Sequence, residues 1–130
     1  MLFRSQLRRA ALDYTVHLNR LAATHPTHLV AHAYVRYLGD LSGGQMLSRI
    51  VANSLGLTDG RGTRFYDFGG PAEVSAHVRE FRAGLARVID ADADAIVAEA
   101  TQAFQMHQRL FNELADASAP WHAPGVSGAR

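Results

Sequence analysis

Apolar positions along the chain recur mainly at intervals of three and four residues, the period of an amphipathic helix. The first segment with this pattern covers about residues 3–24, and the second runs from near Thr27 to Gly56, a residue that can end a helix. A third begins at Pro71, which suits the first position of a helix, and a fourth follows the acidic stretch 90–94. The pattern predicts an all-α fold of four or five helices packed as an irregular bundle.

Two segments lack this periodicity. The stretch TDGRGTRFYDFGG, Thr58 to Gly70, is predicted to be a loop because it is rich in glycine and polar residues. The stretch SAPWHAPGVSGAR, from Ser118, is predicted to be a disordered tail. We therefore expect one helical domain over residues 1–117 and a tail over 118–130.

The amino-acid composition excludes several classes of function but does not identify the function. With 130 residues, the prior is one compact domain. Thirteen basic and twelve acidic residues leave a net charge of +1, so no basic excess points to nucleic acid or to a membrane surface. There is no cysteine, which excludes disulfides and thiolate ligands. No apolar run approaches the length of a membrane span, and the amphipathic start does not look like a secretory signal, so we expect a cytoplasmic protein.

The stretch LSGGQ, Leu41 to Gln45, is also the signature of ABC-transporter ATPases. Such enzymes need a GxxxxGK[ST] phosphate loop and an aliphatic strand that ends in acidic residues. The chain has neither, and the residues on both sides of LSGGQ have a helical pattern. A nucleotide site is therefore not expected.

On a helix that turns by about 100° per residue, the glycines of this stretch share a face of small and polar residues. The members of this face are His32, Arg36, Gly39, Asp40, Gly43 and Leu47. Together with Gly44, the glycines cost about 3 kcal/mol relative to alanine, because each one inside a helix costs about 1 kcal/mol.

Two interpretations of this face are open. One is a small-xxx-small contact in which Gly39 and Gly43 meet a neighbouring helix. The other is a surface on which the backbone approaches a flat ligand closely, with a bend in the helix. The third glycine and the inserted Asp40 favour the ligand surface, and Arg36 and Asp40 suit the wall of a polar pocket.

The stretch LVAHAYVRYLGDLSGGQ, Leu29 to Gln45, closely resembles the distal-helix signature of heme oxygenases. The resemblance continues more loosely through FYDF at 65–68, FRAGL at 81–85 and EATQAF…LFNEL at 99–114. It implies an all-α bundle that holds heme between a proximal helix and a kinked distal helix.

The resemblance also implies roles for residues on the distal helix. Gly39 and Gly43 match the glycines whose backbone lies against the heme and permits the kink. Asp40 matches the carboxylate that organises water near iron-bound dioxygen, and Arg36 matches an arginine of the same polar network. These four are the expected catalytic residues.

Three positions match residues that contact heme elsewhere in the family. Tyr34 and Arg82 match contacts to the heme propionates, and Phe104 matches an aromatic wall of the pocket. Two positions depart from the family pattern. Val78 replaces a frequent lysine, and His107 replaces a frequent amide residue and is interpreted as a satisfied core residue.

The largest departure concerns the proximal histidine, which the family carries on a first helix well upstream of the distal signature. None of the histidines in the chain matches that motif, so the ligand is expected upstream of residue 1. The seven are His17, His25, His28, His32, His77, His107 and His122. We therefore expect an N-terminally incomplete, heme oxygenase-like bundle, a fragment or a short relative, that is incompetent alone.

The activity that the resemblance implies is oxidative cleavage of heme to biliverdin, carbon monoxide and ferrous iron. Heme is both cofactor and substrate, dioxygen is the co-substrate, and electrons come from a reductase or ferredoxin. The alternatives are a non-catalytic helical module that binds heme weakly or not at all, and a related bundle that acts on another small molecule.

Overall fold

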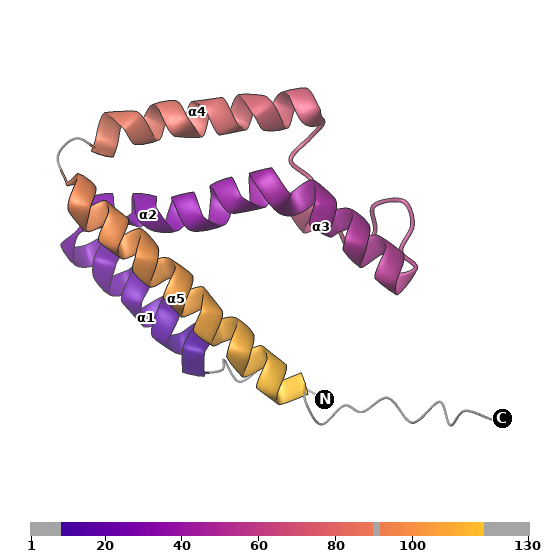
Figure 1. The fold of residues 1–130 in the computed structure, drawn as a ribbon, viewed down its shortest axis with the longest axis horizontal. Coiled ribbons are helices and arrows are strands. Elements are labelled where there is room, and N and C mark those ends of the chain that lie inside the picture. Colours follow the sequence, from indigo (N-terminus) through magenta and orange to yellow (C-terminus); the bar gives the residue numbers. More distant parts are fainter. Residues whose placement is uncertain (1–8, 90–91, 119–130) are drawn as a thin grey trace.

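The computed structural model describes residues 9–89 and 92–118, and every regular element in this part of the chain is helical (Figure 1). The all-α prediction is therefore confirmed. The predicted tail, 118–130, lies outside the described residues apart from Ser118, and stays a prediction. The elements are α1 (Arg9–Thr24), η1 (Pro26–His28), α2 (Leu29–Ala33), η2 (Tyr34–Leu38), α3 (Gly39–Leu55), η3 (Arg64–Tyr66), α4 (Pro71–Ile89) and α5 (Ala93–Ser118).

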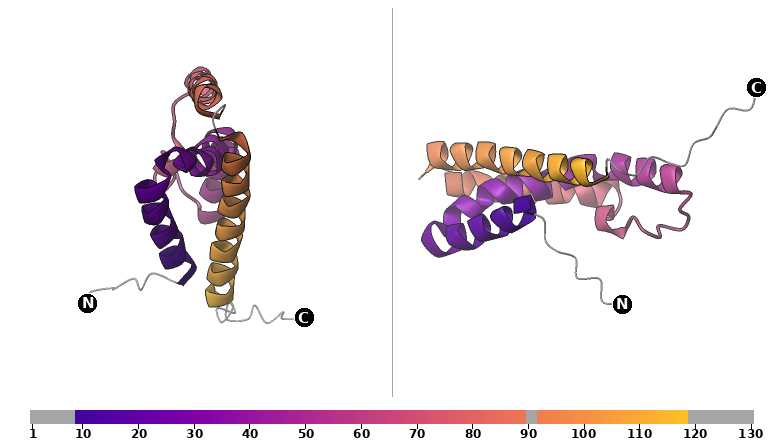
Figure 2. Two further views of the ribbon diagram at one scale, coloured as in Figure 1. Left: turned by 90° about the vertical axis from the view of Figure 1, so that its left-hand side faces the viewer. Right: turned by 90° about the horizontal axis from the view of Figure 1, so that it is seen from below.

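The helices form three layers, as two different views agree (Figures 1 and 2). The run from α2 to α3 lies in the middle, with α4 on one side of it and the pair α1 and α5 on the other. Both α1 and α5 contact α2, and they also contact each other. Residues of α1, α2 and α5 can therefore meet at one place although they are far apart in the sequence.

The predicted second helix is a continuous helical run with a change of type inside it. Five residues, Tyr34–Leu38, form a π-helix between α2 and α3. Such a turn accommodates an extra residue and often marks a bend, and the run is visibly bent in Figure 1. The predicted stop is confirmed: Gly56 has a left-handed φ of 63°, and its N–H bonds to the carbonyl of Ala52.

A carboxylate from the far end of the chain holds the first described turn of α1. Glu113 on α5 accepts hydrogen bonds from the backbone N–H of Arg9 at 3.0 Å and of Ala10 at 2.7 Å. Because these N–H groups have no partner inside the helix, a carboxylate here acts as a cap. This contact fixes α1 against α5.

The apolar core within the described residues is small. Its buried members are Leu21, Ala31, Leu38, Leu41, Ile96 and Ala103. Many large apolar side chains are exposed instead, among them Tyr34, Met46, Ile50, Phe104 and Phe111. No helix in the part that the structure describes has the length and apolar character needed to cross a membrane.

Candidate functional site

The three glycines of the distal stretch have different surroundings. A Cβ added at Gly39 or Gly43 would meet nothing within 4 Å. A Cβ at Gly44 would lie 3.3 Å from Cδ1 of Tyr66, so this glycine makes room for η3. Among the described residues, Gly44 thus packs against Tyr66, whereas nothing packs against Gly39 or Gly43, which face open space.

Arg36 and Asp40 form an ion pair beside these glycines. Nη2 of Arg36 donates to Oδ2 of Asp40 at 3.2 Å. The Asp40 side chain is 18% exposed and that of Arg36 is 42% exposed, so both reach solvent.

Two of the predicted heme-contacting residues line one hollow of about 390 Å³. Tyr34 comes from the π-helix and Phe104 from α5, and both are largely exposed. The other lining residues are Ala31, Leu85, Ile96, Val97, Ala100 and Thr101. The structure brings Tyr34 and Phe104 together in this hollow, with apolar residues around them that the sequence did not indicate.

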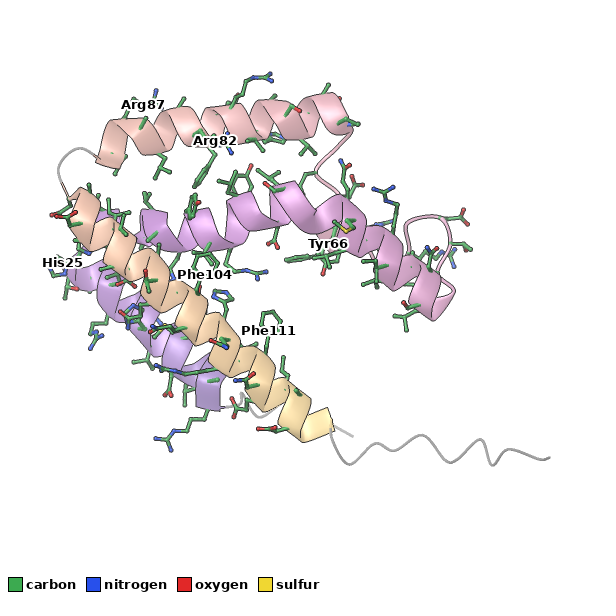
Figure 3. All side chains as sticks on the ribbon, viewed as in Figure 1. His25, Tyr66, Arg82, Arg87, Phe104 and Phe111 are labelled. Carbon is green, nitrogen blue, oxygen red and sulfur yellow. The ribbon has the colours of Figure 1, made fainter. Side chains whose placement is uncertain are left out.

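Arg82 is exposed on α4, in a different layer from Phe104 (Figure 3). Among the described residues, none of the ion pairs involves it. Leu85, which lines the hollow, follows three residues later on the same helix. Residues three apart are neighbours on a helix surface, so Arg82 lies within one turn of the hollow without lining it.

His32 does not share the open face of Gly39, although a regular helix predicted that it would. It is buried, with 5% of its surface exposed, and it contacts α1 and α5. The physical reason is the π-helix between them, since an extra residue changes the phase of everything that follows.

His17 and His32 meet at the carboxylate of Glu99, and we call these three residues the His–Glu junction. Oε1 of Glu99 lies 2.5 Å from Nε2 of His17 and 2.6 Å from Nε2 of His32. Burial raises the pKa of the Glu99 carboxyl, but the hydrogen bonds from both histidines, together with the positive charge of each ring when it is protonated, outweigh burial, so the pKa lies below its usual value. The carboxyl is therefore ionised and accepts from both Nε2–H groups.

The remaining nitrogens of the two imidazoles also have partners. Tyr14 Oη lies 3.2 Å from Nδ1 of His32, and Arg20 Nη2 lies 3.3 Å from Nδ1 of His17. Because Nε2 carries the proton in each neutral ring, Nδ1 accepts from Tyr14 or Arg20. Each neutral imidazole is thus satisfied at both nitrogens.

Tyr14 is a residue that the sequence interpretation did not assign to the site. Its ring packs edge-on against His107 with the centroids 5.0 Å apart. Burial raises the pKa of Tyr14, the positive charge of Arg36 opposes this, and Glu99 adds to it, so the pKa lies above its usual value. The phenol therefore stays protonated; it contacts His32 of the His–Glu junction and lies within the electrostatic influence of Arg36. The available signal was a polar-tipped aromatic residue on an otherwise apolar stripe.

His107, interpreted from the sequence as a satisfied residue, is half-buried on α5. Its Nδ1–H donates to the carbonyl of Ala103 at 2.7 Å. This bond fixes its tautomer and places the other nitrogen, Nε2, away from its own helix backbone.

Known proteins resemble this chain in both sequence and fold. The family model described as heme oxygenase matches residues 3–113. The chain is 41% identical over 111 residues to heme oxygenase 1 of a Nostoc species, covering 84% of this chain and 47% of that protein. It is 44% identical over 107 residues to heme oxygenase 1 of a Synechocystis species, covering 81% and 44%.

Solved structures give the same result. The heme oxygenase of Leptospira interrogans matches with a TM-score of 0.76 and 37% identity, covering 83% of this chain and 54% of that one. Heme oxygenase-1 of Synechocystis, crystallised in complex with heme, matches with a TM-score of 0.75 and 41% identity, covering 85% and 51%. The chain spans about half the length of the curated relatives it matches. The match over most of this chain nevertheless shows that it belongs to the heme oxygenase family.

Proposed function

We propose that this chain forms the distal side of a heme pocket and acts in the oxidative cleavage of heme to biliverdin, carbon monoxide and ferrous iron. The observation that carries the proposal is the open backbone at Gly39 and Gly43 beside the Arg36–Asp40 ion pair. Membership of the heme oxygenase family supports it.

The two open glycines suit a flat ligand. Neither would contact protein atoms if it carried a Cβ, so packing inside the described part of the chain does not explain their small size. Glycines inside a helix cost about 1 kcal/mol each, and close approach of a ligand to the backbone is a reason to retain them. A bare backbone also offers no side chain that competes for the position where dioxygen binds.

Asp40 is placed to hold water and a proton on this face. Its carboxylate has more lone pairs than the two contacts from Nη2 of Arg36 occupy, so it can also accept from water. Bound heme would supply both the iron that activates dioxygen and the porphyrin that is cleaved. In this proposal Asp40 orients a water that delivers a proton, and Arg36 fixes the rotamer of Asp40.

Tyr34, Arg82 and Phe104 are proposed to position the ligand. Phe104 and Tyr34 provide aromatic surface in the hollow. The exposed guanidinium of Arg82, one turn from Leu85, can reach a propionate, and a charged hydrogen bond of this kind is strong. Electrons are proposed to come from a reductase or ferredoxin, with dioxygen as co-substrate.

Heme titration followed by absorbance tests the role of the open glycines. Gly43→Leu should weaken heme binding at least tenfold, since its side chain would fill the face proposed for the ligand. Asn53→Leu is the matched control, because it adds the same side chain at an exposed position of α3. Each titration is repeated with added imidazole, since no described histidine is assigned as the axial ligand. Equal affinity of Gly43→Leu and Asn53→Leu would rule out the close approach.

Product formation tests Asp40. With heme, dioxygen, a reductase and imidazole, Asp40→Ala should keep the heme affinity of the unmodified chain but lose at least tenfold in biliverdin. Asp40→Asn is the matched variant, because it keeps the shape and removes the charge. Unchanged biliverdin in Asp40→Ala would exclude the proposed role of Asp40. The alternative of a non-catalytic helical module predicts no biliverdin from any variant, including the unmodified chain.

A further inference from the structure

The His–Glu junction brings three potential metal ligands together in a buried place. Its residues come from three helices, with His17 on α1, His32 on α2 and Glu99 on α5. Their relative exposures are only 7%, 5% and 9%. The candidate ligand atoms all lie within 4.8 Å of one another, and both Nε2 atoms point at the same carboxylate oxygen.

We propose that His17, His32 and Glu99 bind one divalent transition-metal ion, with Zn²⁺ as the ion to test first. Two imidazole nitrogens and one carboxylate oxygen are a ligand set that Zn²⁺ accepts, with water in the fourth position. The absence of cysteine in the chain leaves imidazole and carboxylate as its strongest ligands for such an ion. None of these three ligands is among the residues proposed to contact heme.

Metal binding needs only a small movement of the carboxylate. Zn²⁺ lies about 2.0–2.2 Å from nitrogen and oxygen ligands, so tetrahedral ligands are roughly 3.2–3.5 Å apart. The present Nε2–Oε1 distances of 2.5 and 2.6 Å are shorter than this. Rotation of the Glu99 side chain away from the two rings by roughly an ångström would open the position between the three ligand atoms.

The proton balance of the step can be written in full. In the metal-free junction each neutral imidazole carries its proton on Nε2, as the contacts to Glu99 require. When Nε2 binds the ion, that proton is lost and Nδ1 takes one up, so each ring stays neutral and no net proton is released. The Nδ1–H of His32 then donates to Oη of Tyr14, the kind of outer contact that orients metal-bound histidine.

Arg20 is the one neighbour that opposes the change. It now donates to Nδ1 of His17 at 3.3 Å, and it would face an Nδ1–H once the ion is bound. Because Arg20 is exposed, its guanidinium can turn into solvent. The same movement would give the ion a path into the buried junction.

Zn²⁺ titration by calorimetry of the full 130-residue chain, after treatment with a chelator, tests the proposal. We expect one ion per chain. Glu99→Gln and His17→Gln should each weaken binding at least tenfold, with circular dichroism confirming that each variant remains helical. Co²⁺ should give the visible absorption of a four-coordinate site in the unmodified chain and lose it in Glu99→Gln.

Three further variants separate this site from other histidines and from mere unfolding. His28→Gln alters a half-buried histidine that is paired with Asp92, outside the junction, and should leave Zn²⁺ affinity unchanged. Tyr14→Phe should weaken binding about tenfold, because it removes the outer acceptor. Arg20→Gln should strengthen binding severalfold, a gain that unfolding cannot produce.

Three results would overturn the proposal. They are no binding at one equivalent, affinity unchanged by Glu99→Gln and His17→Gln, and weakening by His28→Gln alone. Unchanged affinity in Arg20→Gln would likewise contradict the proposed proton rearrangement. The heme experiments above do not depend on any of these outcomes.

Discussion

The same helical run carries two regions of opposite character. In α2, His32 is buried and belongs to a junction in which both imidazoles and the carboxylate of Glu99 are hydrogen-bonded. In α3, Gly39 and Gly43 face open space, and among the described residues Asp40 is held by the partly exposed side chain of Arg36. The π-helix Tyr34–Leu38 separates the two regions.

The difference shows which polar groups stabilise the fold and which are available to a ligand. At the His–Glu junction both nitrogens of each imidazole and Oε1 of Glu99 have protein partners, so removing one group leaves others unsatisfied in a buried place. At the glycine face the polar groups still have lone pairs free for water or ligand, and removing one has little effect on folding. Substitutions at the His–Glu junction should therefore mainly lower stability, whereas substitutions at the glycine face should mainly lower activity.

The largest loss of stability is expected for Glu99→Ala. It leaves the Nε2–H groups of both buried histidines without an acceptor, at about 1–3 kcal/mol for each group. Urea denaturation followed by circular dichroism should show a loss of about 3–5 kcal/mol in the free energy of unfolding. Glu113→Ala is the control, because it removes a carboxylate that caps α1 and should cost only about 0.5–2 kcal/mol. Equal losses in the two variants would mean that the junction is not the stronger contact.

A smaller effect, about 1–2 kcal/mol, is expected for Glu99→Gln at neutral pH, because the amide oxygen still accepts while the charge is lost. The pKa of Glu99 is lowered in the folded chain, so its contribution is present above its unfolded value of about 4.5 and is lost as pH falls through the folded value. The difference in unfolding free energy between the unmodified chain and Glu99→Gln should therefore shrink as pH falls below about 4.5. Subtraction at each pH removes the titration of groups that both chains share. A difference that stayed constant down to strongly acidic pH would contradict this role for the charge.

A gain of about 1 kcal/mol is expected for Gly43→Ala, because alanine favours the helix and its Cβ meets nothing. Gly44→Ala is its neighbour and control, and its Cβ would press against the half-buried ring of Tyr66. We expect Gly44→Ala to gain less than Gly43→Ala or to lose stability in the same urea measurement. If both variants gained equally, the distinction between an open and a packed glycine would fail.

The features of this structure that could be predicted from the sequence are those that depend on neighbouring residues in the chain. The helices, the stop at Gly56 and the start at Pro71 follow from periodicity and from residues with special backbone preferences, and the structure confirms them. The spacing of four residues also places Arg36 and Asp40 one turn apart, and the structure shows an ion pair between them that the sequence analysis did not predict.

The His–Glu junction could not be predicted in this way. His17, His32 and Glu99 lie on separate helices, and nothing in their local sequence states that α1, α2 and α5 meet there. The π-helix was also missed, because its residues, YVRYL, have no composition that distinguishes them from an α-helix. Because the π-helix was missed, His32 was wrongly expected to share the face of Gly39. An extra residue in one turn rotates the side chains that follow it relative to those before it.

The smallest effect on stability is expected for Arg36→Gln. Its ion pair with Asp40 is partly exposed, is longer than an ideal charged contact at 3.2 Å, and has the arginine on the less favourable N-terminal side. Solvent screening therefore limits the loss to less than about 0.5 kcal/mol of unfolding free energy. Biliverdin yield should fall much more than this, because Asp40 loses the contact that fixes its rotamer. Arg79→Gln, an exposed change on α4, is the control for both measurements. A variant that lost stability and biliverdin yield in the same proportion would mean that Arg36 is a structural residue, like those of the His–Glu junction. Asp40 alone would then remain as the charged functional residue beside the open glycines.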